Sequence, residues 1–430
     1  MDYKNYLKRA IFSFLFIIVF SNLLHANSFQ SQIIKLRNWL LMNKDHATGL
    51  PYSHVGDDRF ENWAITYDSA VVTLAYIATG EIKEARKIID FYIDTPNVWR
   101  LGGIIEAVCP TNPVLGEDWS VRTGSNLWMG IAGFHLYRVT GESKYLNFAK
   151  KLADFAISLQ NNDESDFNFG GIRLGPLGSP NVSGDQHLGY DADQPAFYEI
   201  FATEHNIDAY ALFNMLYQET KEAKYKEAKE KVLEWLKRVA YNKEEHRFNR
   251  GYKRGLDTNF ATDVHCWGIS ALGVDVLDTF ESGLAEKMIE FVEKNSLTEI
   301  YYTKPDGKKV KVKGVDFIDY KTAYNLGRKP IVSPEWTFQL INAYRRLELY
   351  FKEKGNIEKE VKYKEKREDL IRSMLDLAIE LNDGTLAYPY ATQPEAIIGH
   401  EYRTPKEKTL SAIGVAYSIL ALLENDPLRY

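Results

Sequence analysis

Cysteine is scarce in this 430-residue chain, which contains only Cys109 and Cys266. Two cysteines cannot form a structural zinc site alone, although they could form one disulfide in an oxidising compartment. The sequence also lacks a G-x-G-x-x-G turn, a phosphate-binding P-loop and a G-x-S-x-G nucleophile motif. Nucleotide chemistry and serine hydrolysis therefore have no support, and no cofactor is expected.

Long apolar runs are also rare, and the one marked example lies at the N-terminus. Three cations in the first nine residues precede "AIFSFLFIIVFSNLL", and the small residue Ala26 follows. This order is typical of a signal peptide over residues 1–26, which predicts a periplasmic or secreted protein without stable membrane contact after cleavage. Because Leu24 stands where a smaller residue is usual, an uncleaved membrane anchor is the alternative.

Positive charge is not in excess. The formal net charge is −6, and removal of three cations and one acid with the signal makes it −8. An acidic protein of this kind is not expected to bind nucleic acid. The basic stretch "KPDGKKVKVKG" (304–314) is the exception, and its alternation with Val310 and Val312 predicts a solvated hairpin edge.

Internal repeats are present and indicate the architecture. "ATGEIKEARKIIDFYI", "VTGESKYLNFAKKLADFAI" and "ETKEAKYKEAKEKVLEWL" each join one helical pattern to the next through a tight polar turn. The helix before each turn is apolar over most of its surface, whereas the helix after it is amphipathic and rich in Lys and Glu. The unit is thus a hairpin with a buried inner helix and a solvated outer helix.

About twelve helices in six such pairs are expected. Their ranges are 31–43, 67–78, 81–94, 124–139, 143–160, 204–218, 221–240, 263–278, 281–295, 334–352, 357–381 and 408–424. Inner-to-outer turns are short, whereas the outer-to-inner loops are long and must share one rim. A superhelical repeat of the tetratricopeptide sort would have short turns at both ends. The asymmetry predicts an all-α fold, a single (α/α)6 barrel domain over residues 27–430, with short strands bordering one rim.

The pattern resembles the (α/α)6 six-hairpin glycosidase superfamily over essentially the whole mature chain. "TYDSAVVTLAYIATGEIKEARKIIDFY", "GSNLWMGIAGFHLYRVTGESKYLNFAKKLADFA", "TEHNIDAYALF", "SPEWTFQLINAYRRL" and the stretch from "YPYATQPEAIIGHEY" to "SILAL" carry the resemblance. The first two resemble helices of family 8 glycoside hydrolases distantly. Asp68 falls close to that family's proton-donor glutamate, and Asn126 falls where an aspartate precedes Leu-Trp. These substitutions prevent transfer of the family 8 catalytic pair.

Carboxyl groups recur where inner helices begin, at Asp68, Asp118, Glu204, Asp263, Glu335 and Glu401. A lone acid in the first turn of a helix is commonly a cap or a dipole partner. Convergence of six helix starts on one cleft instead favours catalysis, since inverting glycosidases need one carboxylic acid and one carboxylate base. Glu204, Asp68 and Glu335 are the catalytic candidates. The substrate-binding candidates are Trp63, Asp118, Trp119, Arg122, His205, Asp263, Trp267, Trp336, Tyr388 and His400.

The sequence therefore predicts an exported glycoside hydrolase that cleaves an oligo- or polysaccharide with inversion. Sugar 2-epimerases share this barrel and use paired histidines, and "EHNIDAYALFNMLYQETKEAKYKEA" resembles their His-bearing helix, so His205, His265 and His400 support an alternative. A noncatalytic carbohydrate-binding barrel is the second alternative. A zinc site is not expected, because no His-x-x-x-His pair occurs.

Overall fold

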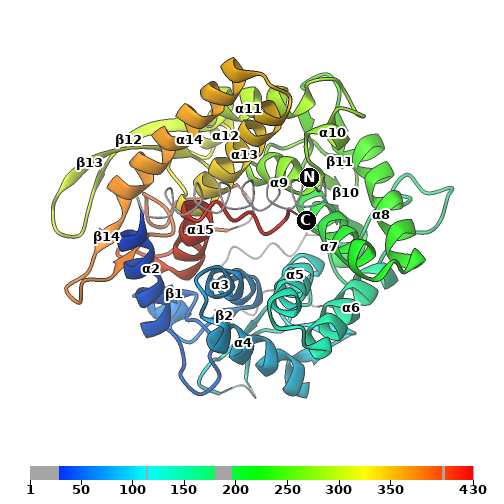
Figure 1. The fold of residues 1–430 in the computed structure, drawn as a ribbon, viewed down its shortest axis with the longest axis horizontal. Helices are drawn as coiled ribbons and strands as arrows, with labels where there is room; N and C mark the ends of the chain where they lie inside the picture. Colours follow the sequence, from blue (N-terminus) through cyan, green and yellow to red (C-terminus); the bar gives the residue numbers. More distant parts are fainter. Residues whose placement is uncertain (1–28, 113–114, 180–195, 400–401, 430) are drawn as a thin grey trace, which may run out of the picture.

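A closed ring of six inner helices forms the centre of the computed structural model, which describes residues 29–112, 115–179, 196–399 and 402–429. Each inner helix contacts the next, and the last contacts the first (Figure 1). The inner helices, in ring order, are α3 (Thr66–Ala78), α5 (Thr123–Thr140), α7 (Thr203–Thr220), α9 (Asp263–Leu272), α13 (Pro334–Glu353) and α15 (Ala412–Leu422). The expectation of an (α/α)6 barrel is confirmed.

Six outer helices surround this ring, one against each inner helix. The outer helices are α4 (Ile82–Asp94), α6 (Ser143–Ser158), α8 (Ala223–Trp235), α11 (Leu284–Asn295), α14 (Ile357–Leu377) and α2 (Gln30–Met42). The first five follow their inner partners in sequence. The sixth pair differs, because α2 comes from the start of the described chain and packs on α15 near its end (Figure 1).

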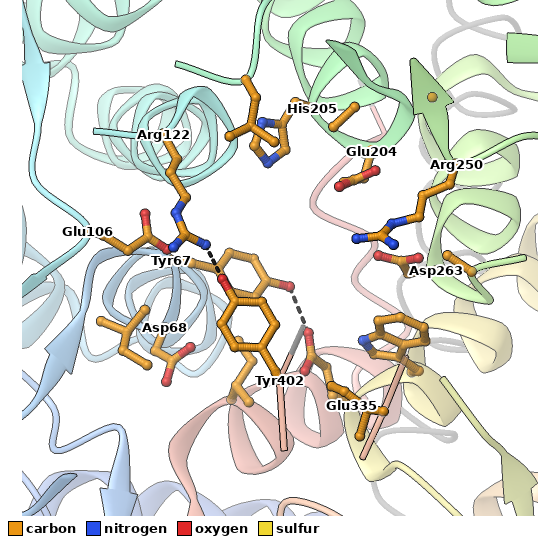
Figure 2. Close-up of a pocket in the computed structure, with 18 of the residues that line it drawn as sticks. Tyr67, Asp68, Glu106, Arg122, Glu204, His205, Arg250, Asp263, Glu335 and Tyr402 are labelled. Carbon is orange, nitrogen blue, oxygen red and sulfur yellow. Dashed lines mark hydrogen bonds between the residues drawn. The ribbon is translucent and has the colours of Figure 1, made fainter. Parts of the chain in front are cut away.

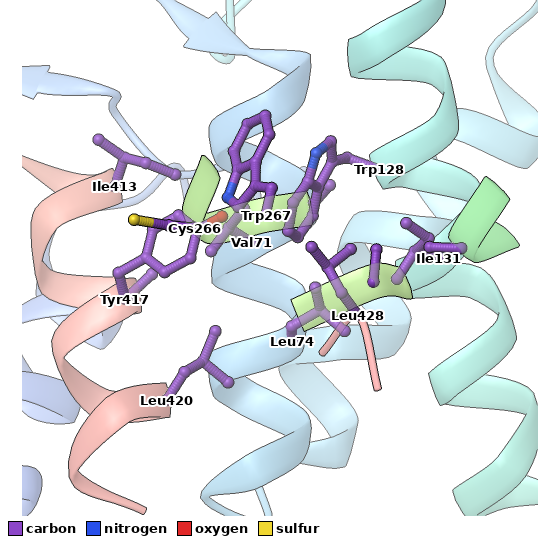
Figure 3. Close-up of a cluster of buried hydrophobic side chains, with 14 of the residues drawn as sticks. Val71, Leu74, Trp128, Ile131, Cys266, Trp267, Ile413, Tyr417, Leu420 and Leu428 are labelled. Carbon is purple, nitrogen blue, oxygen red and sulfur yellow. The ribbon is translucent and has the colours of Figure 1, made fainter. Parts of the chain in front are cut away.

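Burial follows the inner and outer pattern that the sequence predicts. In α3, ten of thirteen residues are buried, whereas α4 buries only one face, formed by Ala85, Ile88, Ile89 and Tyr92. The inner helices pack their large side chains against one another along the barrel axis (Figure 3). Trp128 of α5 contacts Trp267 of α9 and Tyr417 of α15, with ring centroids 5.4 Å and 6.2 Å apart. Aromatic packing therefore fills the barrel below its rim.

The structure corrects several details of the predicted helices. The helix expected over 263–278 is divided at Gly273, whose φ of +77° ends α9 before the short α10 (Val274–Leu277) begins. A π-helical turn follows α8 over Leu236–Ala240, and α12 (Tyr320–Asn325) was not expected. The last helix begins at Ala412, because a strand occupies Leu410–Ser411. Cys109 and Cys266 are both free, so no disulfide joins them.

Short strands border the rim, as expected. They are β1 (His54–Val55), β2 (Ala64–Ile65), β3 (Trp99–Arg100), β4 (Gly103–Ile104), β5 (Ala107–Val108), β6 (Gly116–Asp118), β7 (Ile200–Ala202), β8 (Tyr241–Asn242), β9 (Arg247–Phe248), β10 (Gly251–Lys253), β11 (Leu256–Asp257), β14 (Ile379–Glu380), β15 (Leu386–Ala387) and β16 (Leu410–Ser411). Strands β2, β7 and β16 lead directly into α3, α7 and α15. Their pairing in small antiparallel sheets fixes where these inner helices begin.

The longest strands form the hairpin that the basic stretch predicts. Strands β12 (Leu297–Thr303) and β13 (Lys309–Val315) pair along their whole length. Val310 and Val312 are buried, whereas Lys309 and Lys311 are exposed on the other face. The alternation thus marks a hairpin with one solvated face.

Threonines tie four inner helices to the rim loops. They are Thr66, Thr123, Thr203 and Thr262, each at or next to a helix start. The backbone N–H of Thr66 donates to the Glu106 carbonyl at 2.8 Å, and its hydroxyl donates to the preceding carbonyl at 2.7 Å. Likewise, the backbone N–H of Thr203 donates to the Arg250 carbonyl at 2.9 Å, and its hydroxyl donates to the Asn249 carbonyl at 2.7 Å. These bonds hold Glu106 and Arg250 at equivalent places on the rim.

Asparagines one turn later attach α5 and α7 to further loop residues. The side-chain amide of Asn126 accepts from the Ile104 N–H at 2.7 Å and donates to the Ile104 carbonyl at 2.9 Å. Asn206 makes the equivalent pair with Ile172, at 2.7 Å and 3.1 Å. Asn126 is thus a structural residue in this chain.

Two further predictions concern the membrane and the N-terminus. Within the ranges that the structure describes, no helix combines the length and the apolar character needed to cross a bilayer. The predicted signal peptide, residues 1–26, lies outside the described residues.

Candidate active site

A pocket of about 390 Å³ opens where the inner helices begin. The three predicted catalytic acids, Asp68, Glu204 and Glu335, all line it (Figure 2). They come from α3, α7 and α13, which alternate with the other inner helices around the ring. The three carboxyl groups therefore approach the pocket from three separate sides.

Glu335 is the most firmly held of the three acids. It lies in the first turn of α13, after Pro334 and the capping hydroxyl of Ser333. Its Oε1 accepts a hydrogen bond from the Tyr67 phenol at 2.9 Å and another from Gln339 Nε2 at 3.3 Å. Burial, with a smaller contribution from the charge of Asp68, raises the pKa of Glu335 to about 8. The carboxyl is thus protonated at neutral pH, and the bonds at Oε1 leave Oε2 to carry the proton.

Asp68 faces the same pocket from α3 and is buried. Burial raises its pKa to about 7, which a hydrogen bond from Ser53 opposes and the charge of Glu106 reinforces. Its Oδ2 has no hydrogen-bond partner among the described residues. A buried carboxyl oxygen without a partner, in a polar pocket, is available to a ligand.

Glu204 and Asp263 lie close to Arg250 on the opposite side of the pocket from Asp68 (Figure 2). Burial and, to a smaller extent, the charge of Asp257 raise the pKa of Glu204, whereas burial and the charge of Glu204 raise the pKa of Asp263 to about 8. The guanidinium of Arg250 points toward both carboxyl groups (Figure 2) and favours their ionised forms. Because Asp263 also accepts from the Val264 N–H at 2.9 Å, its orientation is fixed. Two acids and one cation are most stable here when one of the acids keeps its proton.

Arg122 connects the pocket wall to a loop from the far end of the chain. It precedes α5 and donates a hydrogen bond to the Tyr402 hydroxyl (Figure 2). Asp118 Oδ2 lies 3.7 Å from its Nη2, and Glu106 also faces it. Glu106 accepts from the Ser125 hydroxyl at 2.7 Å. Asp118 and Arg122, which were both predicted to bind substrate, thus line the pocket as an ion pair.

Aromatic side chains supply apolar walls. Trp63, Trp267 and Trp336 line the pocket as predicted. Two other candidates, Trp119 and Tyr388, lie outside this pocket. Trp119 packs against Arg100, whose Cζ lies 3.9 Å from the centroid of the Trp119 ring, and does not line the pocket. Tyr388 is fully buried against Phe338 in the core.

The three predicted histidines differ in where they lie relative to the pocket. His205 lines the pocket beside Glu204, where burial and the charge of Arg122 lower its pKa to about 3. His265 is buried in α9, bonded to the Ala261 carbonyl at 2.8 Å, and does not line the pocket. His400 lies outside the described residues, as does Glu401. His54, which the sequence did not single out, lines the pocket with a pKa lowered by burial to about 4.

Sequence reasoning missed Tyr67, Glu106, Arg250 and Tyr402 as pocket residues. Glu106 and Arg250 lie on loops, where no periodicity marks a residue as facing a cleft. The repeated threonines at the helix starts are a signal that points toward these two residues, because each threonine binds the backbone of the loop residue concerned. Tyr67 directly precedes Asp68, but helix periodicity does not show that it reaches Glu335.

Within the described ranges, the histidines, cysteines and acids form no cluster of three or more with the arrangement of a metal site. The carboxyl, guanidinium and aromatic side chains that line the pocket can transfer protons, form hydrogen bonds and contact apolar surfaces of a ligand.

Comparison with known proteins supports the fold. No protein-family model and no curated protein matches the chain. Among solved structures, cellobiose 2-epimerase from Bacillus thermoamylovorans B4167 is similar with a TM-score of 0.62 at 13% identity, over 93% of this chain and 98% of that one. A family 76 α-mannanase from Bacteroides thetaiotaomicron has a TM-score of 0.59 at 11% identity, over 94% and 97%. An inactive α-1,6-mannanase variant from Salegentibacter sp. HEL1_6, in complex with α-1,6-mannotriose, has 0.57 at 12%, over 92% and 98%.

These neighbours are glycoside hydrolases and a sugar epimerase that share the (α/α)6 barrel. At 11–13% identity the likeness establishes the fold of this chain and not its reaction, because one fold carries many reactions.

Proposed function

We propose that the protein is a glycoside hydrolase that cleaves an oligo- or polysaccharide. The observation that supports this proposal is the combination, in one aromatic-lined pocket, of Glu335, held protonated by burial, with Glu204, whose pKa burial raises and whose ionised form the Arg250 charge favours. One carboxyl that keeps its proton and one that loses it are the two groups that glycosidic bond cleavage needs. Pocket tryptophans supply the flat apolar surfaces against which sugar rings stack.

In the proposed mechanism, Glu335 protonates the leaving oxygen from Oε2 while Glu204 takes a proton from the attacking water. Glu204 on α7 and Glu335 on α13 are separated in the ring by α9. Because the helix that carries the base is not a neighbour of the helix that carries the acid, a water molecule has space between the base and the sugar. Attack by that water on the face opposite the leaving group favours inversion. Asp68, whose pKa is raised to about 7, is the second candidate for the proton donor.

Sugar epimerisation is the second candidate function, because two histidines line the same pocket. The pKa values of His54 and His205 are lowered to about 4 and about 3, so both rings are neutral at physiological pH. A neutral imidazole can remove a proton from carbon, but the step also needs a proton donor on the other face of the substrate. A noncatalytic carbohydrate-binding barrel is the third reading.

One experiment separates the three functions. The protein is incubated with α-1,6-mannotriose and with cellobiose, and the anomeric protons are followed by NMR. Hydrolysis produces new reducing ends, and the first anomer to appear reports inversion or retention. Epimerisation changes the reducing-end sugar without shortening the chain. Ligand-induced shifts without turnover across a wider panel of polysaccharides would favour the binding barrel.

Export is part of the proposal. The charged start, apolar run and small residue of residues 1–26 support removal of a signal peptide and a periplasmic or secreted location.

A further inference from the structure

His205 is held at one ring nitrogen by a residue that belongs to a neighbouring inner helix. Its Nδ1 lies 2.9 Å from the hydroxyl oxygen of Thr123, the first residue of α5. Its Nε2 makes no hydrogen bond with any residue that the structure describes. The ring lies at the pocket edge between Arg122 and Glu204 (Figure 2).

The hydrogen bonds of Thr123 determine which ring nitrogen carries the proton. Its hydroxyl oxygen lies 2.9 Å from the Arg173 carbonyl oxygen and 3.0 Å from the Leu174 carbonyl oxygen. Carbonyl oxygens only accept, so the single hydroxyl proton must point toward them. With that proton engaged, the hydroxyl oxygen can only accept from His205. Nδ1 therefore carries the ring proton, and Nε2 keeps its lone pair.

Gly124 provides the space that this arrangement requires. A Cβ on Gly124 would lie 2.5 Å from both Nε2 and Cδ2 of His205, closer than real Cβ contacts allow. Gly124 is helical and has no positive φ, so backbone strain does not explain a glycine at this position. The missing side chain instead lets the imidazole lie against the start of α5 with Nε2 uncovered.

We propose that Thr123 and Gly124 are positioning residues that fix His205 as the Nδ1-protonated tautomer and present its Nε2 lone pair to the pocket, where it accepts a hydrogen bond from a substrate hydroxyl. The tautomer stands on geometry alone. The identity of the donor as a sugar hydroxyl rests on the proposed carbohydrate pocket. A site built to accept a hydroxyl proton discriminates against substrates in which that hydroxyl is absent or methylated.

The tautomer is measured directly by long-range proton–nitrogen NMR on protein labelled with 15N-histidine. The His205 signals are assigned by their loss in His205→Gln. We expect Nδ1 to give the shift of a protonated nitrogen and Nε2 that of an unprotonated one, at every pH from 5 to 8. The opposite assignment, with the proton on Nε2, would overturn the proposal.

Two variants at position 123 form a matched pair. Thr123→Ser keeps the hydroxyl and should preserve the tautomer, whereas Thr123→Val keeps the shape, removes the acceptor and should move the proton largely to Nε2. Thr123→Val spectra identical to those of the native protein would remove Thr123 from the positioning role. If Thr123→Val fails to fold, the native tautomer and the Thr123→Ser spectrum still decide the question. Gly124→Ala should shift both ring nitrogens, since its methyl group meets the ring, and unchanged shifts would exclude Gly124.

The acceptor role is tested with α-1,6-mannotriose, cellobiose and their mono-deoxy analogues. A sugar that binds should shift the Nε2 signal while Nδ1 stays protonated, and one deoxy analogue should lose at least about tenfold in affinity. Hydrolysis without an Nε2 shift would refute the acceptor role and leave the proposed function intact. An Nε2 shift without cleavage would support the acceptor role and refute hydrolysis of that sugar. A panel in which no sugar shifts Nε2 counts against the acceptor role, while the tautomer result stands.

Discussion

The phenol of Tyr67 on α3 donates a hydrogen bond to Glu335 on α13, although α15 lies between these two helices in the ring. Tyr417 on α15 bridges the gap, with its hydroxyl 3.0 Å from that of Tyr67. Because the Tyr67 proton is engaged by Glu335, Tyr417 must be the donor in the second bond. A chain of two phenols therefore holds Oε1 of the proposed proton donor.

Replacing Tyr67 by Phe tests this arrangement through the pH dependence of turnover. The Tyr67 bond lowers the pKa of Glu335, so its removal should raise that pKa and move the alkaline limb of the rate profile to higher pH. Loss of a bond to the proton donor should also reduce kcat by roughly tenfold. Tyr417→Phe, which removes a hydroxyl that makes no hydrogen bond to Glu335, is the control and should move the limb less. An unmoved limb in Tyr67→Phe would exclude Glu335 as the titrating acid.

Glu204→Gln should lower kcat by at least about 100-fold, because the amide keeps the size of the side chain but cannot accept the proton of water. The measurement is the initial rate of reducing-end release by purified protein. Glu227→Gln, at an exposed position on α8, is the matched control and should retain full activity. Full activity in Glu204→Gln would remove Glu204 from the mechanism.

The pocket acids should make the protein less stable as pH rises. The pKa of Glu335 is about 8 in the folded protein against an ordinary value of 4.5, so between these values the folded state binds more protons than the unfolded state. The stabilisation that Glu335 contributes to the folded state is fully present below pH 4.5, and it is lost as pH rises through 8. Asp68 and Asp263 act in the same direction. We expect Tm to fall by roughly 3–5 °C between pH 5.5 and pH 8.5.

The same thermal scans on Glu335→Gln provide the control, because the variant lacks one of these titrations and its Tm should fall less over that range. A variant whose Tm changes with pH as much as that of the native protein would show that Glu335 does not titrate with a raised pKa.

Contact between α2 and α15 predicts a large stability effect far from the pocket. Trp39 on α2 is 1% exposed, and its loss should cost about 3–5 kcal/mol of unfolding free energy in Trp39→Ala. Ile34 lies on the same helix but is 37% exposed, so Ile34→Ala should cost less than about 1 kcal/mol. Chemical denaturation monitored by circular dichroism gives both values. A cost in Trp39→Ala as small as that expected for Ile34→Ala would mean that Trp39 does not contribute to the core.

The proposed export predicts a mature protein that begins near residue 27. Intact-mass measurement on protein from the native host checks this, since cleavage after Ala26 removes the three cations and the apolar run together. A full-length mass in the membrane fraction would favour the uncleaved anchor, and a full-length mass in the cytoplasm would refute export.

Much of the fold follows from the sequence because inner and outer helices differ so strongly in composition. The apolar "YDSAVVTLAYIA" is suited to the inner layer of a two-layer ring, where nearly all of its surface is buried. The charged "IKEARKIIDFYID" is suited to the outer layer, because it has one apolar face and one face for solvent. The break at Gly273 was not predicted, since a glycine inside a helical pattern is compatible with either a cap or a continuous helix.

The candidate site was only partly predictable. Acids in the first turns of inner helices, such as Asp68, Glu204 and Glu335, face the pocket because the ring directs every inner helix start to one rim. Trp119 and Tyr388 were equally plausible by composition, yet local packing against Arg100 and Phe338 takes them elsewhere. Whether a loop side chain such as Tyr402 reaches the pocket depends on contacts between distant segments, which no local pattern encodes.

The pairing of α2 with α15 also bears on the order in which the chain folds. Five hairpins are contiguous in sequence and can form as soon as each is synthesised, but the sixth joins helices separated by more than 300 residues. Closing so long a loop is entropically costly and must await the last helix. Until α15 emerges, the apolar flanks of α3 and α13 that it covers lack a partner. We therefore expect the ring to close only after α15 has been synthesised, as the last step in assembling the barrel.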